Sequence, residues 1–436
     1  MKDTINIFWF RRDLRLEDNV GLFHALNAKY NVLPIFIFDK DILESLPKND
    51  ARVTFIHKTL SDINDTLKEK FESSLATFHN KPLEVFKQLA TNYVINTVFT
   101  NHDYEPYAKR RDNDVKAFLE TKNIDFKSYK DQVIFETNEV VKDDGTSYKV
   151  YTPYSKKWIE TLQNNFIKNY NSEENLSRLV MASNLPFLSL SDIGFVKSNQ
   201  TIESFDASDS IINNYEATRN FPAKEGTSKL GPHLRFGTVS ARKMVQKALK
   251  SHNNTFLKEL IWREFFMQIL WHFPHTITKS FKPQYDAIQW RNDKEEFKAW
   301  CEGKTGYPLV DAGMRELNET GFMHNRVRML VGSFLCKHLL IDWRLGEAYF
   351  AEKLHDYELA SNVGNWQWVA GCGVDAAPYF RIFNPTTQIQ KFDKDHTYIK
   401  QWVPEYQELT YTQPIVEHKF ARERCLKTYK EALDQF

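Results

Sequence analysis

The sequence predicts two domains, an α/β domain with a parallel, Rossmann-like sheet followed by an all-α domain. A chain of 436 residues is longer than one ordinary hydrophobic core supports. Short apolar runs alternate with helical patterns in the first third of the chain, whereas helical periodicity alone follows from about residue 206. We therefore expect an α/β domain over 1–130, a connector over 131–205 and a helical domain over 206–436.

Three apolar runs carry the α/β prediction: residues 5–10, 33–38 and 94–99 are rich in β-branched and aromatic side chains. Such continuous runs are typical of parallel strands buried on both faces, and a helical pattern such as 55–71 separates them. The first run leads into neither G-x-G-x-x-G nor G-x-x-x-x-G-K-[ST], so the sheet has no dinucleotide fingerprint and no P-loop.

The first run is followed by R-R-D-L-R-L-E-D-N, over residues 11–19. Asp18 is of a residue type that caps helices, and we expect a helix to begin there. Clustered arginines can bind an anion, but composition alone favours a solvated or ion-paired turn.

Later helix boundaries are also readable from residue types. A helix is predicted to start at Tyr151, with Pro153 in its first turn. Apolar spacing predicts a long helix over 256–273. Pro308 and Gly321 are placed to begin and end another helix.

Composition excludes several classes of protein. The formal net charge is +1, so any surface that binds DNA must be a local basic patch. The four cysteines form no C-x-x-C pair, which argues against a disulfide framework and against a zinc site, and we expect no metal. No run of 18 apolar residues exists and no signal peptide is recognisable, so we expect a cytoplasmic protein that does not contact a membrane.

One stretch, residues 355–385, combines polar and aromatic side chains within an otherwise apolar segment. Asp356, Glu358, Asn362, Trp366 and Trp368 all fall in it. Buried polar groups need hydrogen-bonding partners, so a core segment rarely carries this many. The stretch therefore predicts a binding site for a flat, polar ligand.

Two further groups are weaker signals when taken alone. Hydroxyl and backbone N–H groups over 227–231 precede a helix and could cradle a phosphate, although an ordinary capped loop explains them as well. Glu259 and Trp262 share a helix face, and the simplest interpretation of Glu259 is an ion pair with Arg263, worth about 0.3–0.5 kcal/mol.

Taken together, these motifs resemble the DNA photolyase/cryptochrome family. The stretch 355–385, the F-x-R-R-D-L-R-x-x-D-N pattern, E-x-x-W-R-E-F over 259–265 and M-H-N-R-V-R-M over 323–329 all match it. The resemblance covers nearly the whole chain. Within the family, the chain is most similar to class I cyclobutane pyrimidine dimer photolyases. The resemblance implies an N-terminal antenna-type domain and an all-α C-terminal FAD-binding domain that holds FAD in a folded, U-like shape.

The resemblance also implies which residues bind FAD. Asp356 would touch the flavin and pair with Arg328, and Asn362 would face flavin N5 and favour the reduced form used in repair. Three matched positions depart from the usual family residue: Phe256, Gly231 and Glu358. The full implied set is Tyr215, Thr227, Ser228, Lys229, Leu230, Gly231, Phe256, Arg263, Arg328, Asp356, Tyr357, Glu358 and Asn362.

The reaction implied by the resemblance is light-driven repair of cyclobutane pyrimidine dimers, by electron transfer from excited reduced FAD to a flipped-out lesion. A chain of three tryptophans would bring electrons to the flavin during photoreduction, with Trp366 nearest to it, Trp343 in the middle and Trp290 at the surface. The implied lesion pocket contains Glu259, Trp262, Asn325, Met329 and Trp368, and the implied DNA contacts are Arg326, Arg381 and Gln388.

Three other functions remain open at this stage. A cryptochrome, a blue-light receptor, would be expected to carry a long disordered extension, and the sequence shows none before Phe436. A photolyase for another lesion, such as (6-4) photoproducts, is disfavoured by Asn325 and Met329. A light-independent flavoprotein would leave the tryptophan chain unexplained. We expect UV-damaged DNA as the partner, a monomer without an obligate protein partner, and a possible second antenna chromophore, whether folate, deazaflavin or flavin.

Overall fold

The computed structural model describes residues 3–435 and divides into two compact units, each assembled from three stretches of chain. The first unit contains the chain up to residue 136, together with 160–204 and 230–250. The second contains 137–159, 205–229 and the chain from 251 onward. The predicted boundaries at 130 and 205 stay a prediction, and the contact-based units follow a different division because 160–204 and 230–250 pack with the α/β part.

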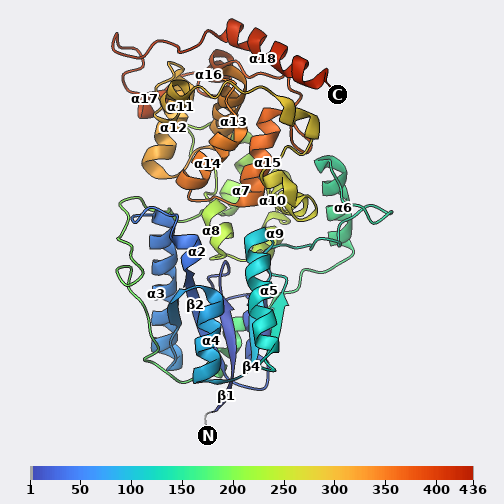
Figure 1. The fold of residues 1–436 in the computed structure, drawn as a ribbon, viewed down its shortest axis with the longest axis vertical. Coiled ribbons are helices and arrows are strands. Elements are labelled where there is room, and N and C mark those ends of the chain that lie inside the picture. The colour runs from blue at the N-terminus through green and yellow to red at the C-terminus, as the bar shows by residue number, and fades with distance from the viewer. Residues whose placement is uncertain (1–2, 436) are drawn as a thin grey trace. The chain divides into compact units, whose positions relative to one another are not determined.

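A five-stranded, fully parallel sheet forms the centre of the first unit, in the order β3-β2-β1-β4-β5 (Figure 1). The three predicted strands are confirmed. The two edge strands are short and more polar, and the sequence analysis missed them. The strands are β1 (Thr4–Phe10), β2 (Val32–Asp39), β3 (Ala76–Asn80), β4 (Val94–Asn101) and β5 (Asp125–Tyr129).

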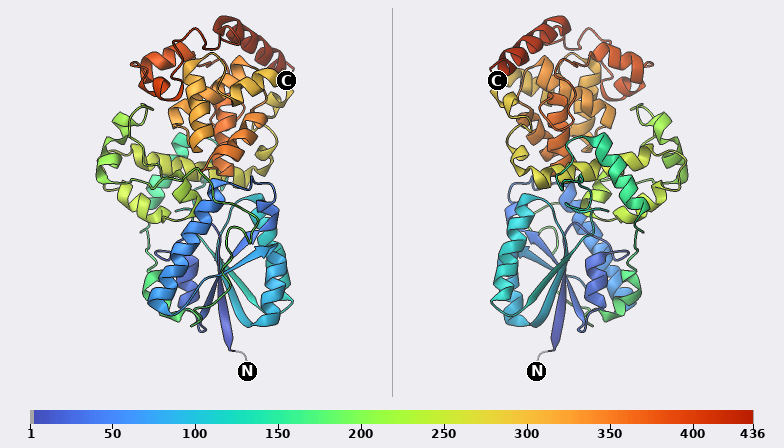
Figure 2. Two further views of the ribbon diagram at one scale, coloured as in Figure 1. Left: turned by 90° about the vertical axis from the view of Figure 1, so that its left-hand side faces the viewer. Right: turned by 90° about the vertical axis from the view of Figure 1, so that its right-hand side faces the viewer.

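Helices cover both faces of this sheet (Figure 2). Phe8 and Phe10 of β1 pack into the same cluster as residues of α1 (Val20–Leu26) and α3 (Ala51–Phe71). Ile7 and Trp9 point the other way, into the cluster that contains residues of α4 (Pro82–Asn92) and α5 (Pro106–Glu120). Burial on both faces explains why all residues of β1 from Ile5 to Phe10 except Asn6 are apolar. The other helices wholly in this unit are α2 (Lys40–Leu43), η1 (Ser172–Arg178), α8 (Gly231–Phe236) and α9 (Ala241–Ala248).

The second unit is helical, and α12, α13, α14, α15 and α18 share its core. The long helix predicted over 256–273 is confirmed as α10. Pro308 and Gly321 do bound α12, and Gly321 has the left-handed φ of +67° that favours glycine at a helix end. Its elements are α7 (Asp209–Thr218), α10 (Thr255–His272), η2 (Pro274–Ile277), η3 (Pro283–Ala287), α11 (Lys294–Cys301), α12 (Pro308–Thr320), α13 (Asn325–Ser333), η4 (Phe334–His338), α14 (Trp343–Lys353), α15 (Leu359–Ala370), α16 (Pro385–Phe392), α17 (Thr397–Trp402) and α18 (His418–Leu433).

Helix α6 (Tyr151–Gln163) begins at the predicted residue. The four cysteines are free thiols. None of the helices between residues 3 and 435 combines the length and the apolar composition needed to cross a bilayer.

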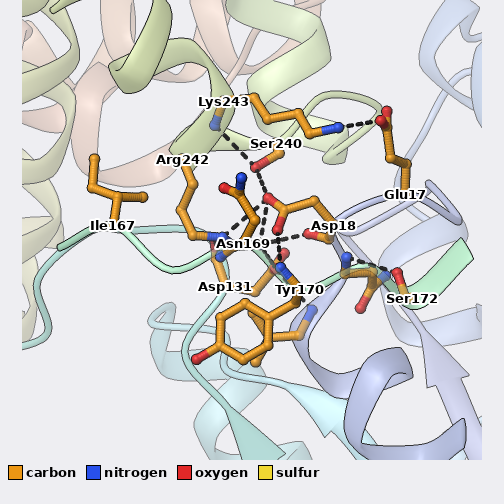
Figure 3. Close-up of polar contacts among 12 residues, drawn as sticks. Glu17, Asp18, Asp131, Ile167, Asn169, Tyr170, Ser172, Ser240, Arg242 and Lys243 are labelled. Carbon is orange, nitrogen blue, oxygen red and sulfur yellow. Dashed lines mark hydrogen bonds and ion pairs between the residues drawn. The ribbon is translucent and has the colours of Figure 1, made fainter. Parts of the chain in front are cut away.

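A buried cluster of charges ties together distant segments of the first unit (Figure 3). Asp131 accepts hydrogen bonds from Arg15 at 2.7 Å and from Arg242 at 2.9 Å. Asp18 accepts from Arg242 Nε at 3.1 Å and from the backbone N–H of Tyr170 at 2.8 Å. The R-R-D-L-R-L-E-D-N segment is therefore ion-paired, as its composition favoured.

The prediction that Asp18 caps a helix is wrong. Its backbone has a left-handed φ of +47°, whereas a cap residue needs extended backbone. Asn19 takes the role, with φ −103° and a side chain that accepts from Leu22 N. The Asp18 carboxylate serves the ion cluster instead.

Neutralising the centre of this cluster should destabilise the first unit. Burial opposes ionisation of Asp131, but Arg15 and Arg242 outweigh it and hold the pKa of this carboxyl below its ordinary value. Asp131→Asn removes the carboxylate that pairs with Arg15 and one of the two that pair with Arg242, and Asp18 remains as the other. We expect the change to cost about 3 kcal/mol. Urea unfolding followed by circular dichroism measures the loss.

The matched control is Asp62→Asn, since Asp62 forms an exposed ion pair with Lys58 and should change stability by less than about 0.5 kcal/mol. Because the Asp131 pKa is depressed, its contribution is full above the unfolded-state pKa and is lost as the pH falls through the folded-state pKa. Equal urea midpoints for the two variants would contradict the prediction.

Candidate functional site

Helix α15 is the centre of the candidate site, because it packs against α10, α13 and α14. A Cβ atom at Gly364 would lie 2.2 Å from the Phe266 ring of α10. A Cβ atom at Gly346 of α14 would lie 2.2 Å from Trp366. These two close approaches join α10, α14 and α15, and α13 packs against α15 as well. The four helices carry predicted site residues: Glu259 and Trp262 on α10, Asn325 and Met329 on α13, Trp343 on α14, and Asn362, Trp366 and Trp368 on α15.

Two ion pairs hold the segment before α15. Arg328 donates to both carboxylate oxygens of Asp356, at 3.1 and 2.9 Å, so the expected pair is confirmed. Arg263 of α10 pairs with Glu358 at 3.2 Å, and both side chains are largely buried. The first pair links this segment to α13 and the second links it to α10.

The predicted ion pair between Glu259 and Arg263 is wrong. Glu259 pairs with Arg219, which follows the last residue of α7. The Arg219 guanidinium also lies over the Tyr215 ring, 5.3 Å from its centroid. Arg263 turns toward Glu358 instead. Because 40 residues separate Arg219 from Glu259, no spacing rule could have paired them.

Trp262 stacks on a residue that the sequence analysis did not connect with the site. The rings of Trp262 and Tyr151 are 3.7 Å apart and nearly parallel, with an interplanar angle of 6°. The Tyr151 hydroxyl donates to the carbonyl of Lys258 at 2.8 Å. Burial, with Glu259 nearby, raises the pKa of the Tyr151 phenol, so it stays a neutral donor and keeps the indole in place.

The first turn of α13 gathers several polar groups near Met329. Asn325 is exposed at the helix start, directly after the capping residue His324. Arg326 donates toward the Met329 sulfur at 3.7 Å and pairs with Asn220. Its guanidinium lies 4.4 Å from the centroid of the Phe392 ring at the end of α16. Helix α16 also carries Gln388, whereas Arg381 is exposed in the loop that precedes α16.

The three tryptophans of the expected electron chain differ in exposure. Trp366 and Trp343 are buried, at 3 % and 1 % exposure, and Trp290 is partly exposed. The partial exposure of Trp290 is compatible with the surface position, whereas the exposures of Trp366 and Trp343 do not distinguish the inner from the middle position, so the order of the chain stays a prediction. Trp366 also makes an edge contact with Trp300, with ring centroids 6.2 Å apart.

Asn362 is buried on α15 and its amide direction is fixed. Its Nδ2 donates to the backbone carbonyl of Glu347 at 3.0 Å and to Glu347 Oε1 at 2.9 Å. Burial raises the pKa of Glu347, and the hydrogen bond from Asn362 opposes that rise. Neither amide hydrogen of Asn362 can bond to another group without breaking its bond to Glu347. The carbonyl oxygen is therefore the atom of this amide that a ligand could use.

The remaining expected cofactor residues lie in the 215–231 region and beside it. Tyr215 packs edge-on against Phe256, with centroids 5.4 Å apart. Ser228 is buried, and Lys229 has a left-handed φ of +51°. Hydroxyls and an ammonium suited to phosphate therefore stand in one loop, and this donor set fits FAD. Tyr357 is partly exposed, and Leu230 and Gly231 fall in the 230–250 segment of the first unit.

Glu316 of α12 is a buried carboxyl beneath the first turn of α13. It accepts from the Tyr398 hydroxyl at 2.5 Å and from the backbone N–H of His324 at 3.2 Å. Burial raises the pKa of Glu316 to about 7 and lowers the pKa of the His324 ring to about 4. Neither group was singled out by the sequence.

The first unit contains a separate crevice outside the carboxyl ends of β1, β2 and β4. It encloses about 830 Å³ of empty space, its open mouth included. In parallel sheets ligands bind at this edge, where the strand order reverses. One wall is apolar and the other is charged, and the residues that the sequence analysis missed include Asp39, Asp103, Glu105, Tyr107, Arg111 and Arg235.

The charged wall of this crevice is held by internal pairs. Arg12 lies 3.0 Å from Glu105 and 3.3 Å from Asp103. The Tyr107 hydroxyl donates to Asp39 Oδ2 at 2.6 Å. Flat rings would find an apolar wall on one side and fixed polar groups on the other, which is the usual make-up of a ligand pocket.

Comparison with known proteins gives matches along almost the entire chain. Residues 6–172 match the family described as DNA photolyase, and residues 256–410 match the family described as FAD binding domain of DNA photolyase. The deoxyribodipyrimidine photo-lyases of Agrobacterium fabrum and Escherichia coli are each 36 % identical to this chain. The alignments cover 98 % of this chain in both cases, and 98 % and 99 % of the relatives.

Solved structures agree. A bacterial class III photolyase from Agrobacterium tumefaciens superposes with a TM-score of 0.87 at 33 % identity, covering 100 % of this chain and 98 % of that one. An archaeal photolyase from Sulfolobus tokodaii, which contains two FAD molecules, gives 0.82 at 31 % identity, with 98 % and 100 % coverage. A cryptochrome from Synechocystis gives 0.86 at 25 % identity, with 98 % and 99 % coverage.

The buried carboxyl of Glu316 should make stability depend on pH. Its folded-state pKa of about 7 lies above the ordinary value of an unfolded glutamate, near 4. Between these pH values the folded protein holds a proton that the unfolded chain has released. The free energy of unfolding should therefore fall by up to about 3 kcal/mol as the pH rises from 4 to 7.

Glu316→Gln keeps an acceptor for Tyr398 and His324 but cannot ionise. We expect the variant to show a flatter pH dependence than the wild type in urea unfolding between pH 5 and 8. Glu295→Gln, which alters an exposed residue of α11, should leave the wild-type slope unchanged. An unaltered slope in Glu316→Gln would place the titration elsewhere.

Proposed function

Because the chain belongs to the DNA photolyase family, we propose that it repairs cyclobutane pyrimidine dimers in UV-damaged DNA by a light-driven reaction. The observation that carries this proposal is the joint placement on α10, α13 and α15 of acid, amide, thioether and indole groups. Glu259, Trp262, Asn325, Met329 and Trp368 form this set. It supplies flat apolar walls together with a few polar contacts, as a flipped base requires.

FAD is the cofactor that the family match implies, and the donor set fits it. Thr227, Ser228 and Lys229 would bind the pyrophosphate. Asp356, held by Arg328, and Asn362 would contact the edge of the flavin ring. When bound and reduced, FAD supplies after light absorption the electron that opens the cyclobutane ring and then recovers it.

The residues of the chain do the positioning. Enzymes that act on a base inside duplex DNA, photolyases among them, must first turn it out of the stack. Trp262 would pack on the extruded lesion, with Tyr151 fixing the indole from behind. Glu259 would accept a hydrogen bond from a pyrimidine N–H, and its ion pair with Arg219 orients the carboxylate.

Phosphate contacts would place the strand without reading its sequence. Arg326, Arg381 and Gln388 are the side chains proposed for this role. Because the net charge of the chain is only +1, binding would depend on this local group and should weaken as salt rises.

The lesion that is repaired and the photolyase class of the chain are also part of the proposal. Asn325 and Met329 favour the cyclobutane dimer over the (6-4) photoproduct, and they favour class I by resemblance. One similar solved structure is a class III photolyase, so assignment to class I stays a prediction. The Synechocystis cryptochrome makes a light receptor the second candidate.

The crevice of the first unit is the proposed place for a second, light-harvesting chromophore. Its position at the carboxyl edge of the sheet and its apolar and charged walls support this role. The similar archaeal photolyase contains two FAD molecules, with a novel light-harvesting cofactor implied. Folate, deazaflavin and flavin remain the alternatives here.

We further propose that the protein acts as a monomer in the cytoplasm, without an obligate protein partner. The direct test of function is repair of an oligonucleotide that carries one thymine dimer, with reductant present, in blue light and in darkness. Light-dependent recovery of the thymines is expected. Retention of the dimer by a protein with bound, reducible FAD would favour another lesion or the receptor function, and the (6-4) lesion would be tested next.

Glu259→Ala should lower repair without releasing FAD, because the carboxylate is proposed to contact the lesion and not the cofactor. We expect a loss of about tenfold or more in dimer affinity, since a hydrogen bond to a charged group contributes about 1.5–3 kcal/mol. Binding in the dark and flavin absorbance measure the two effects. Glu295→Ala is the exposed control, and equal dimer affinity in both variants would defeat the assignment of Glu259.

Trp366→Phe should block light-driven reduction of the bound flavin, since phenylalanine is much harder to oxidise than tryptophan. Repair should persist once the flavin has been reduced chemically, because Trp366 has no proposed contact with the lesion. Flavin absorbance under illumination measures the first effect. Trp402→Phe, on α17, is the control, and wild-type reduction rates in Trp366→Phe would break the proposed chain.

A further inference from the structure

The loop between α15 and α16, residues 371–384, presents an exposed tip. The Phe380 side chain is 60 % exposed and Arg381 is exposed beside it. Two short internal hydrogen bonds shape the tip, from Arg381 N to Pro378 O at 2.9 Å and from Ile382 N to Phe380 O at 3.1 Å. An exposed phenylalanine next to an arginine is suited to contact bases and phosphate in DNA, but only if the tip is held in place.

A buried lysine forms a hydrogen bond to the main chain of the tip. Lys337 is 1 % exposed, and its Nζ donates to the main-chain carbonyl of Arg381 at 2.9 Å. On the other side Tyr379 stacks on the fully buried Tyr429 of α18, with centroids 5.7 Å apart and rings 13° from parallel. The exposed side chains therefore project from a segment that is fixed on both sides of Phe380, at the Tyr379 ring and at the Arg381 carbonyl.

Packing alone does not explain a lysine at this position. A methionine of similar length would fill the same space, whereas a buried ammonium loses several kcal/mol of hydration. Burial lowers the pKa of Lys337 to about 8, although the thiols of Cys425 and Cys336 act in the opposite direction. The ammonium thus remains largely protonated at neutral pH and donates strongly to the loop carbonyl.

The position of Lys337 in the fold connects the loop with the lesion pocket. Residues 334–338 form η4, a π-helix that continues directly from α13. Such π turns are rare in proteins, and those that occur often lie at functional sites. Asn325 and Met329 on α13 and Lys337 on η4 therefore belong to one continuous helical segment, which supports both the proposed lesion pocket and the loop.

We propose that Lys337 is a positioning residue for damaged duplex DNA, because it holds the Phe380–Arg381 tip in the orientation that fills the duplex beside a flipped-out dimer. This inference rests on the proposed repair function. A single strand has no partner bases to be replaced and less stacking to break. Lys337 should therefore matter for duplex substrate and not for the same lesion in a single strand.

The test uses the full-length protein with FAD bound and the variant Lys337→Met. Affinity in the dark is measured by fluorescence anisotropy for two oligonucleotides with one thymine dimer, one single-stranded and one in a duplex. We expect about tenfold weaker duplex binding, since one hydrogen bond from a charged group is lost. Single-strand affinity, FAD content and repair of the single strand should stay within about twofold of the wild type.

Lys400→Met is the matched control, since Lys400 is exposed and also donates to a main-chain carbonyl, that of Asp395 at 3.1 Å. It should leave both affinities unchanged. Equal losses for duplex and single strand in Lys337→Met, or no loss for either, would overturn the inference. If the wild type repairs neither substrate, the proposed function itself fails, and this result is distinct from the other two.

Should Lys337→Met fail to retain FAD, two measurements replace it. Lys337→Gln keeps a neutral donor on a shorter side chain and should show the same duplex-specific loss, to a smaller degree. In the wild type, the amides of Arg381 and Ile382, which both donate hydrogen bonds within the tip, should exchange slowly before DNA is added. Exchange as fast as in an exposed, unbonded segment would overturn the anchoring role.

Discussion

The close contact of α15 with α10 and α14 is the constraint on which the second unit depends. Protein interiors are packed as densely as organic crystals, so even one added methyl group must displace a neighbour. At Gly364 that neighbour is the Phe266 ring, and at Gly346 it is the Trp366 indole. Separating α15 from α10 would move Glu259 and Trp262 away from the indoles of α15, and separating α15 from α14 would move Trp343 away from Trp366.

The sequence predicted those elements whose signal is local. β1, β2 and β4 are rich in apolar residues because most of their length is buried, and α10 shows helical spacing of its apolar residues. The turn before α1 was harder, because Asp18 and Asn19 are both good capping residues. The difference between them is the left-handed backbone of Asp18, whose carboxylate pairs with Arg242, 224 residues away.

In the candidate site, too, local features could be predicted from the sequence, whereas contacts between distant residues could not. Resemblance supplied the proposed site residues, and residue chemistry explained why such groups suit a ligand, but the partners of these groups depend on the fold. Spacing offers Glu259 only one cation, Arg263, four residues on. In the structure Arg263 is drawn to Glu358, and Arg219 from α7 takes its place. Tyr151 behind Trp262 is equally invisible to spacing, since its helix lies more than 100 residues earlier.

The exchange of partners has a physical consequence for the segment 355–358. Asp356 reaches Arg328 on α13, and Glu358 reaches Arg263 on α10, so adjacent acids tie one turn to two different helices. The family pattern has a shorter aspartate where this chain has Glu358. The extra methylene brings the carboxylate to within 3.2 Å of the guanidinium, and a buried charge left unpaired would cost several kcal/mol. Arg263 is thus engaged by Glu358, and the Glu259 carboxylate pairs with Arg219.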